Sequence, residues 1–186
     1  MERNILWMPW DGPGLEHLRL TDATGDILAD GVIIGVADGA PFRARYTVQC
    51  DPQWRVRAVR IDMLDGANRR LDLYCDGAGH WADDTGAELP GLAGCFDIDI
   101  SVTPFTNSLP IRRLLLSPGV SADITVVYID LPALTVQPEM QRYTRLAGDI
   151  ARYRFEARST GFTADLPVDA DGLVQDYPGL FRRIEE

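Results

Sequence analysis

The chain has 186 residues, of which 46% are hydrophobic and 25% are charged, and these ordinary globular values exclude an intrinsically disordered chain. Its 18 cationic side chains, all of them arginine, face 28 acidic ones, and the net charge of −10 opposes non-specific binding to nucleic acid or to anionic membrane surfaces. The length allows a substantial core but is short for two domains, so we expect a single domain over residues 1–186.

In the first half of the chain, apolar and polar residues alternate in short segments, which is the pattern of half-buried β-strands. These segments are residues 5–10, 15–20, 27–36, 42–50, 54–64 and 70–75. In the third segment, Asp30 and Gly31 predict a hairpin-type turn or a bulge. In the fifth, the apolar phase changes near Ala58 and Val59, which predicts a bulge or a move between packing layers.

The centre of the chain combines a predicted strand with a predicted irregular connection. Over residues 96–103 the apolar side chains are expected on one face, and Asp97 and Asp99 on the other. Pro104 and Pro110 then interrupt the strand, and a second apolar run follows. We therefore predict a rigid, irregular connection between two core strands.

The second half of the chain predicts more strands and two short helical pieces. Strands are expected over residues 122–131, 150–158 and 162–168, with a short proline-bounded segment at 134–137. Residues 138–146 have the pattern of a short helix, and residues 175–183 that of one helical turn. Strands at this spacing predict an all-β sandwich, barrel or roll with at most short helices.

Cysteine and histidine are too few and too scattered for a structural metal site. The three cysteines, Cys50, Cys75 and Cys95, form no CxxC pair, and an odd count argues against a disulfide framework. Residues 1–10 lack a signal-peptide pattern, no lipidation cysteine is apparent, and no apolar run is long enough for a transmembrane helix. We expect a cytoplasmic protein with buried thiols, no metal and no cofactor.

The densest polar chemistry lies between residues 97 and 113. Asp97 and Asp99 share a strand face at about 7 Å, where they suit acid/base chemistry or a divalent ion, although such pairs are common on solvated sheet faces. Arg112 and Arg113 suit an anion, or a salt bridge to one of these carboxylates. The block also contains hydroxyl and amide side chains that either contact a ligand headgroup or satisfy backbone groups, namely Thr103, Thr106 and Asn107.

Two more dispersed features also have competing interpretations. Arginines at alternate positions of predicted strands would form either a cationic face for phosphate or carboxylate, or a wet sheet face with cross-strand ion pairs. They are Arg43, Arg45, Arg55, Arg57, Arg152 and Arg154. Aromatic residues, among them Trp7, Tyr143, Tyr177 and Phe181, either stack on sugar or line a lipid cavity, or belong to the core. The chain has no GxSxG, P-loop or GxGxxG motif.

Several segments together resemble one bacterial domain-of-unknown-function family, labelled "putative glycolipid-binding". They include Asp76-Gly77-x-Gly79-x-Trp81, Gly94-Cys95-x-Asp97-x-Asp99, Thr103-Pro104-Phe105-Thr106-Asn107 and Asp169-x-Asp171-Gly172. The resemblance covers essentially the whole chain and implies a single-domain, many-stranded antiparallel β-roll or open barrel. That fold has been likened to carriers of lipoproteins and lipids, and the family provides no catalytic residues to transfer.

Three functional hypotheses follow. The first is a non-enzymatic protein that binds a glycolipid or another amphiphile, with an apolar groove, a polar mouth, and headgroup contacts in the 97–113 block. The second is an enzyme acting on a sugar or phosphorylated small molecule through Asp97, Asp99, Arg112 and Arg113. The third is an interaction module that oligomerises through a sheet edge, and the sequence leaves the oligomeric state open.

Overall fold

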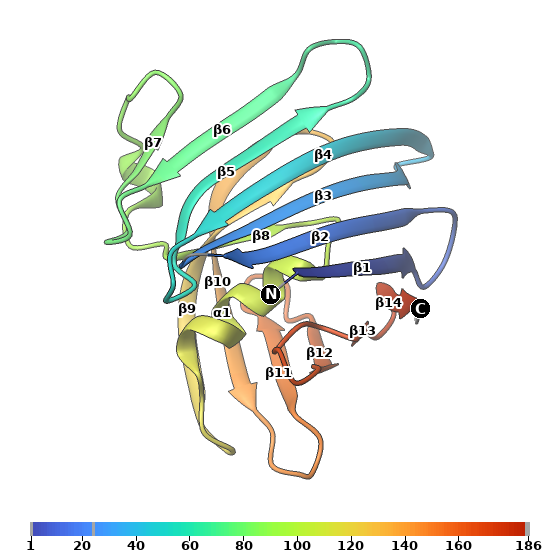
Figure 1. Ribbon diagram of the computed structural model, residues 1–186, viewed down its shortest axis with the longest axis vertical. Coiled ribbons are helices and arrows are strands. Elements are labelled where there is room, and N and C mark those ends of the chain that lie inside the picture. Colours follow the sequence, from blue (N-terminus) through green and yellow to red (C-terminus); the bar gives the residue numbers. More distant parts are fainter. Residues whose placement is uncertain (1, 24, 185–186) are drawn as a thin grey trace.

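Two curved β-sheets enclose one α-helix in the computed structural model, which describes residues 2–23 and 25–184 (Figure 1). The larger sheet has nine strands in the order β13-β14-β1-β2-β3-β4-β5-β6-β7. Its strands are β1 (Glu2–Pro9), β2 (Leu15–Ala23), β3 (Asp26–Ala37), β4 (Ala40–Cys50), β5 (Val56–Met63), β6 (Arg70–Cys75), β7 (Trp81–Asp83), β13 (Asp176–Tyr177) and β14 (Phe181–Ile184).

The smaller sheet has five strands in the order β12-β11-β10-β9-β8. Its strands are β8 (Asp97–Ile100), β9 (Ser121–Asp130), β10 (Thr135–Arg145), β11 (Arg152–Ala157) and β12 (Thr163–Pro167). A short 3-10 helix, η1 (Pro90–Leu92), connects the sheets, and the α-helix α1 (Phe105–Leu114) follows β8. The expected all-β, predominantly antiparallel fold with short helices is confirmed.

Within each sheet, strands that follow one another along the chain pair in antiparallel fashion, with one exception. Strands β8 and β9 run parallel, with Asp99 opposite Tyr128, and α1 provides the crossover that a parallel pair requires. The last strand, β14, pairs with the first, β1, so that Arg183 lies opposite Trp7. The first and last strands of the described chain therefore lie side by side in the large sheet.

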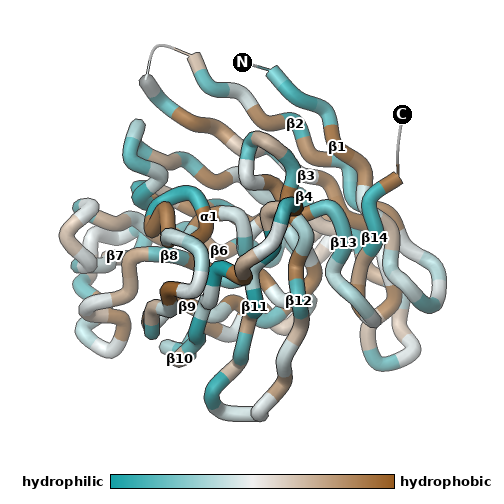
Figure 2. Tube along the Cα trace, turned by 90° about the horizontal axis from the view of Figure 1, so that it is seen from below, coloured by the Kyte–Doolittle hydropathy of each residue, from teal (hydrophilic) through white to brown (hydrophobic). Residues whose placement is uncertain are grey.

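Alternation along each strand determines which face is buried. In β4, Ala44, Tyr46 and Val48 are buried, whereas Arg43 and Arg45 are exposed. Figure 2 shows the same alternation of hydrophobic and hydrophilic residues along the strands of the large sheet. The buried faces of both sheets form the core, because apolar side chains leave water only where the two sheets and α1 cover one another.

Helix α1 lies in this core, where the sequence predicted an irregular connection. The Phe105 ring stacks on Tyr46 of β4 with centroids 6.3 Å apart, and Asn107 Nδ2 donates to the Tyr143 hydroxyl of β10 at 2.9 Å. Pro104 directly precedes the helix, a position that needs no intrahelical donor, and Pro110 lies inside it. The prediction of an irregular connection was wrong because contacts with both sheets stabilise the helix despite its prolines.

The strand predicted over residues 96–103 is shorter and more buried than expected. β8 covers Asp97–Ile100, and Asp97 has 0% exposure, whereas Phe96 is 37% exposed. The interpretation of the aspartate pair as part of a solvated sheet face is therefore wrong. Helix α1 packs against β8 and excludes water from the aspartate side, so both faces of the strand are covered.

Two segments expected to be helical are strands. Residues 134–146, predicted as a short segment and a helix start, contain the strand β10, in which Pro138 pairs with Val127. The C-terminal helical turn predicted over residues 175–183 is the hairpin β13–β14, in which Tyr177 lies opposite Phe181. Pairing with neighbouring strands overrode the local pattern in both places.

The predicted bulge near Ala58 is present, but the predicted turn at Asp30 is not. Between β4 and β5, Gln49 lies opposite Ala58 and Cys50 opposite Val56, so that β5 has one extra residue. Strand β3 passes through Gly31 without interruption, and Gly31 lies opposite Tyr46. A glycine is required there because the Tyr46 ring lies against the Cα atom.

We expect Gly31→Ala to lower the free energy of unfolding by about 1–3 kcal/mol, the usual cost of overpacking a core. A Cβ atom at position 31 would lie 2.2 Å from Tyr46 Cε1, so the ring would have to move. Gly91→Ala is the matched control, because no atom lies within 4 Å of its added Cβ. Urea denaturation measures both variants, and equal stabilities would contradict this role of Gly31.

Candidate functional site

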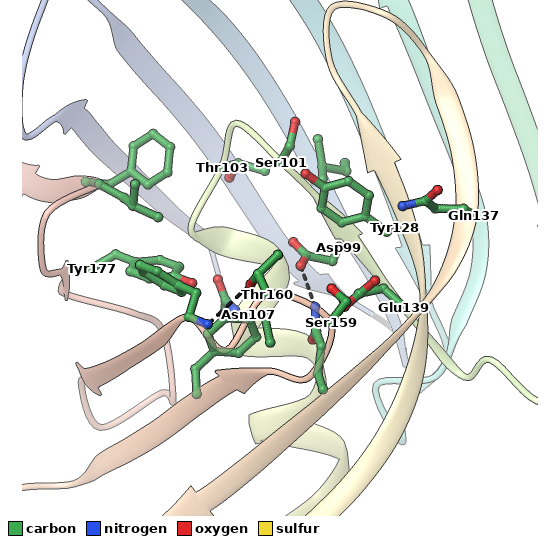
Figure 3. Close-up of a pocket in the computed structure, with 17 residues that line it drawn as sticks. Asp99, Ser101, Thr103, Asn107, Tyr128, Gln137, Glu139, Ser159, Thr160 and Tyr177 are labelled. Atoms are coloured by element: carbon green, nitrogen blue, oxygen red, sulfur yellow. Dashed lines mark hydrogen bonds between the residues drawn. The ribbon is translucent and has the colours of Figure 1, made fainter.

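A cavity of about 450 Å³ lies between the smaller sheet, the segment after β8 and the C-terminal hairpin, and we name it the Asp99 cavity. Figure 3 shows its side chains arranged around one space, with the Tyr177 ring on one side. Polar lining residues come from β8 and the segment after it, from β10 and from the β11–β12 turn. They include Asp99, Ser101, Glu139, Gln141, Ser159 and Thr160. The size is typical of small-molecule sites.

Asp99 is a half-buried carboxylate of this cavity. Its Oδ2 accepts a hydrogen bond from Gln141 Nε2 at 2.6 Å, and its Oδ1 accepts one from Thr106 Oγ1 at 3.4 Å. Burial raises the pKa of Asp99 to about 6, against the opposing effect of these hydrogen bonds. The group thus changes between acid and carboxylate close to neutral pH.

A chain of hydrogen bonds holds the floor of the cavity. Asn107 Nδ2 donates to the Tyr143 hydroxyl, which donates to Gln141 Oε1 at 3.4 Å, and Gln141 donates to Asp99. Burial raises the pKa of the Tyr143 hydroxyl well above its ordinary value, so it remains a donor. The Asp99 carboxylate is therefore held by side chains from α1 and β10, which are rigid elements.

Aromatic rings form the wall beside these polar groups. Phe155 contacts Tyr177 edge-on with centroids 6.0 Å apart and lies 6.3 Å from Phe162. Tyr177 in turn contacts Phe181 at 6.4 Å. Hydroxyl, amide and carboxylate groups beside aromatic faces suit a ligand that has both C–H and O–H groups on one ring.

A second cavity, of about 350 Å³, lies against the inner face of the large sheet, and we name it the Glu16 cavity. Its lining is mainly apolar and includes Trp7, Pro9, Ile33, Phe42 and Val102. Leu180 and Phe181 line both this cavity and the Asp99 cavity, so both cavities border the C-terminal hairpin.

Glu16 is the one carboxylate in this cavity that is buried, with 3% of its surface exposed. Its Oε1 accepts hydrogen bonds from the Tyr46 hydroxyl at 2.5 Å and from Thr103 Oγ1 at 2.7 Å. Its Oε2 is buried and has no hydrogen-bond partner within residues 2–23 and 25–184. Burial raises the pKa of Glu16 from 4.5 to about 7, although the two hydrogen bonds oppose this rise.

Sequence analysis did not identify Glu16, although the sequence has a signal for it. Glu16 shares the inner face of β2 with Leu18 and Leu20, both of which have 0% exposure. A lone carboxylate in the apolar phase of a strand must be buried or must disrupt the strand. That conflict singles out the residue.

The structure separates the seven predicted site residues. Asp99, Thr103 and Asn107 line the Asp99 cavity, and Thr103 also connects it to Glu16. Thr106 does not line the cavity but contacts Asp99, and its hydroxyl oxygen accepts a hydrogen bond from the backbone N–H of Ile100. These four residues are brought together by β8 and the start of α1.

The other three predicted residues serve contacts outside both cavities. Arg113 forms a bidentate ion pair with Asp97, with Nη2 2.6 Å from Oδ2. Arg112 lies over the Trp54 ring at 4.7 Å and donates to the Asp171 carbonyl at 2.8 Å. The enzyme hypothesis needs a pocket that holds at least one of the two carboxylates, with Arg112 or Arg113 to hold an anion. Asp99 lines the Asp99 cavity, but neither arginine does.

The predicted arginine face is divided between the two sheets. Arg43 and Arg45 lie on β4, whereas Arg152 and Arg154 lie on β11 of the smaller sheet. Cross-strand ion pairs occupy several of them, such as Arg45 with Asp30 at 2.8 Å and Arg154 with Asp165 at 2.8 Å. The alternative of a wet sheet face with ion pairs therefore holds, and a single cationic face is wrong.

A larger cavity, of about 580 Å³, lies beside β6, β7 and η1 and has none of the seven predicted residues in its lining. Within the described part of the chain, no three His, Cys, Asp or Glu side chains cluster as metal ligands. The chemistry of the site therefore rests on the Asp99 and Glu16 cavities.

Residues 4–183 match the model of a protein family that is described as "Putative glycolipid-binding". The chain belongs to this family. A DUF1089 family protein from Pseudomonas aeruginosa, known from a crystal structure, shares 40% sequence identity with this chain. The two structures superpose with a TM-score of 0.81. The match covers 94% of this chain and 95% of that chain. None of the curated proteins compared matches this chain.

Membership of the family described as "Putative glycolipid-binding" confirms the resemblance found in the sequence motifs, and the similar crystal structure supports the all-β fold. The family description is consistent with a binding role for this chain. Among the residues that the structure describes, no helix has the length and apolar character needed to cross a membrane.

Proposed function

We propose that the protein binds a glycolipid-like amphiphile, with its hydroxyl-rich head in the Asp99 cavity and its chain in the Glu16 cavity. The observation that carries this proposal is that two cavities with different linings share Leu180 and Phe181. Many polar side chains lie beside aromatic rings in one, and mainly apolar residues line the other. An amphiphile has the same two-part character as these two cavities. The family description supports the same class of ligand.

The lining of the Asp99 cavity supports the placement of the head. Asp99 and Glu139 accept hydrogen bonds from hydroxyl groups, and Gln141 and Ser159 both donate and accept. The aromatic rings of Phe162 and Tyr177 provide flat apolar faces for the C–H groups of a sugar ring. No cationic side chain lines this cavity among the described residues, so a neutral head fits better than an anionic one.

The lining of the Glu16 cavity supports the placement of the chain. Pro9, Ile33 and Phe42 offer apolar surface, and so does Leu180, a lining residue that is 41% exposed. Each methylene group transferred from water to such a surface stabilises the complex by about 0.8 kcal/mol. Affinity is therefore expected to rise with chain length.

Titration calorimetry with alkyl β-D-glucosides below their critical micelle concentrations tests this proposal. We expect affinity to rise about fourfold for each added methylene while the chain fits the cavity. Phe162→Ala is expected to weaken decyl glucoside binding about tenfold, because it removes one ring from the head cavity. Tyr74→Ala is the matched control, since Tyr74 and Phe162 are 43% and 40% exposed and Tyr74 lines neither cavity.

Two results would contradict the proposal. One is the absence of decyl glucoside binding to the folded wild-type protein. The other is an equal loss of affinity in the Phe162→Ala and Tyr74→Ala variants, which would show that the Asp99 cavity does not hold the head.

A further inference from the structure

The unpartnered oxygen of Glu16 indicates a contact that the protein alone does not complete. Glu16 Oε2 is buried and accepts or donates no hydrogen bond within the described residues, whereas Oε1 receives two hydroxyl donors. An unpaired buried polar atom normally costs folding stability. Glu16 also lines the Glu16 cavity, so a ligand in that cavity is the available partner.

The hydrogen bonds at Oε1 determine where the acid proton of Glu16 resides. Tyr46 and Thr103 both donate to Oε1, so in the neutral acid the proton lies on Oε2. Burial favours this neutral acid up to about pH 7. The neutral side chain then offers one O–H donor to the cavity.

The surrounding groups favour an acceptor on the ligand. Two titratable residues lie near Glu16 in this cavity. Tyr46 of β4 donates a hydrogen bond to it, and Asp11 of the β1–β2 loop lines the same cavity. No arginine or histidine lines the cavity among the described residues. Nothing there compensates an anionic ligand, whereas an uncharged carbonyl oxygen pairs with the O–H group of Glu16.

Glu16 lies where the head and the chain of an amphiphile would join. Thr103 lines the Asp99 cavity and donates to Glu16, which lines the apolar cavity. In an acylated glycolipid, the ester or amide carbonyl occupies this junction between the sugar and the chain. An alkyl glycoside has only an ether oxygen at the same place, and it is a weaker acceptor.

We propose that Glu16 donates a hydrogen bond from Oε2 to an acyl carbonyl, and that the protein selects acylated amphiphiles over alkyl ones. This inference rests on the proposed function, because it assigns the junction of the same ligand. Glu16 is thus a specificity-determining residue. Because the pKa of Glu16 is raised to about 7, we expect this hydrogen bond to be lost above that pH, where Glu16 ionises.

Two uncharged probes separate the carbonyl contact from the rest of the site. N-decanoyl-N-methylglucamine and decyl β-D-glucopyranoside have the same chain length and sugar-derived heads, but only the first has a carbonyl group. Titration calorimetry gives the ratio of their affinities at each pH. Titration of Asp99 affects the head of both probes, so the ratio isolates Glu16.

For the wild-type protein, we expect this ratio to fall about tenfold between about pH 5.5 and pH 8.5, the effect of losing one hydrogen bond to a buried acceptor. For Glu16→Gln, we expect a constant ratio, because the amide Nε2 donates at every pH while Oε1 still accepts from Tyr46 and Thr103. Glu16→Met removes the donor and is expected to give the low ratio throughout. Thermal melting verifies that each variant is folded.

A wild-type ratio that does not change with pH would overturn the inference while leaving the proposed function intact. A ratio that rises with pH would overturn it as well, since Glu16 would then act as a carboxylate toward a donor. If neither probe binds the folded protein, the proposed function fails, and the inference fails with it.

Discussion

Replacing Arg113 by methionine is expected to lower the free energy of unfolding by about 3–5 kcal/mol, the usual cost of leaving one buried charge without its partner. Asp97 has 0% exposure, and both of its oxygens accept hydrogen bonds from Arg113. Burial raises the pKa of the Asp97 carboxyl, and the charge and hydrogen bonds of Arg113 oppose that rise. Without Arg113, the folded protein must protonate Asp97 or bury a bare carboxylate.

This destabilisation is expected to depend on pH and on the partner. It becomes smaller as the pH falls, because protonation of Asp97 removes the unpaired charge. The double variant Asp97→Leu with Arg113→Met is expected to recover most of the loss, since two apolar side chains replace the pair. Both comparisons use urea denaturation monitored by tryptophan fluorescence.

Arg154→Met provides the matched control for Arg113→Met. Arg154 also forms a two-point ion pair, with Asp165, but the side chains are 47% and 34% exposed. Water screens such a pair, so its loss is expected to cost less than about 1 kcal/mol. Equal costs for the two variants would refute a structural role for the buried pair.

Replacing Glu16 by glutamine is expected to stabilise the protein by about 3 kcal/mol at pH 8, because one pKa unit corresponds to about 1.4 kcal/mol. The folded protein holds the pKa of Glu16 at about 7, above its ordinary value of 4.5. The folded state therefore binds the proton more tightly than the unfolded state does. Stability due to neutral Glu16 is complete below about pH 4.5 and is lost as the pH rises toward 7.

The variant and the wild type should therefore be equally stable near pH 4 and should diverge until about pH 7, where the difference becomes constant. Glutamine preserves the contacts of Oε1 and has no charge to bury. Glu88→Gln is the control, because Glu88 is exposed and its replacement removes no buried charge. Parallel stability curves for wild type and Glu16→Gln across this range would contradict the assignment of Glu16 as a buried acid.

Together the two predictions separate the charged groups by their roles. Asp97 and Arg113 stabilise the packing of α1 on β8, so removing one partner is expected to lower stability without changing the lining of either cavity. Glu16 destabilises the folded protein at neutral pH. A group that costs stability and faces a cavity is typical of a functional site.

Part of the candidate site can be predicted from the sequence. Asp99, Thr103 and Asn107 were predicted as ligand contacts from the density of polar groups, and the structure places all three in the Asp99 cavity. Arg112 and Arg113 were predicted with them but face Asp171 and Asp97. Proximity along the chain could not separate the two groups, because a helix directs successive residues to different sides.

The sequence by itself determined the strand segments in which a period of two is clear, such as residues 42–50 and 70–75. It also determined the family, through motifs that include Thr103-Pro104-Phe105-Thr106-Asn107. Both conclusions depend on local pattern alone. A period of two follows from strand geometry, and short motifs carry family membership without any knowledge of packing.

Only the tertiary structure decided which polar groups are buried and what they face. Asp97 follows an ordinary alternating pattern and Glu16 interrupts the apolar phase of β2, but only packing shows that α1 covers Asp97 and that Glu16 lies in a cavity of the large sheet. Residues 105–114 are helical for the same reason, because Tyr46 and Tyr143 from two separate strands hold them there. Burial depends on contacts between segments distant in the chain, and local periodicity contains no information about those contacts.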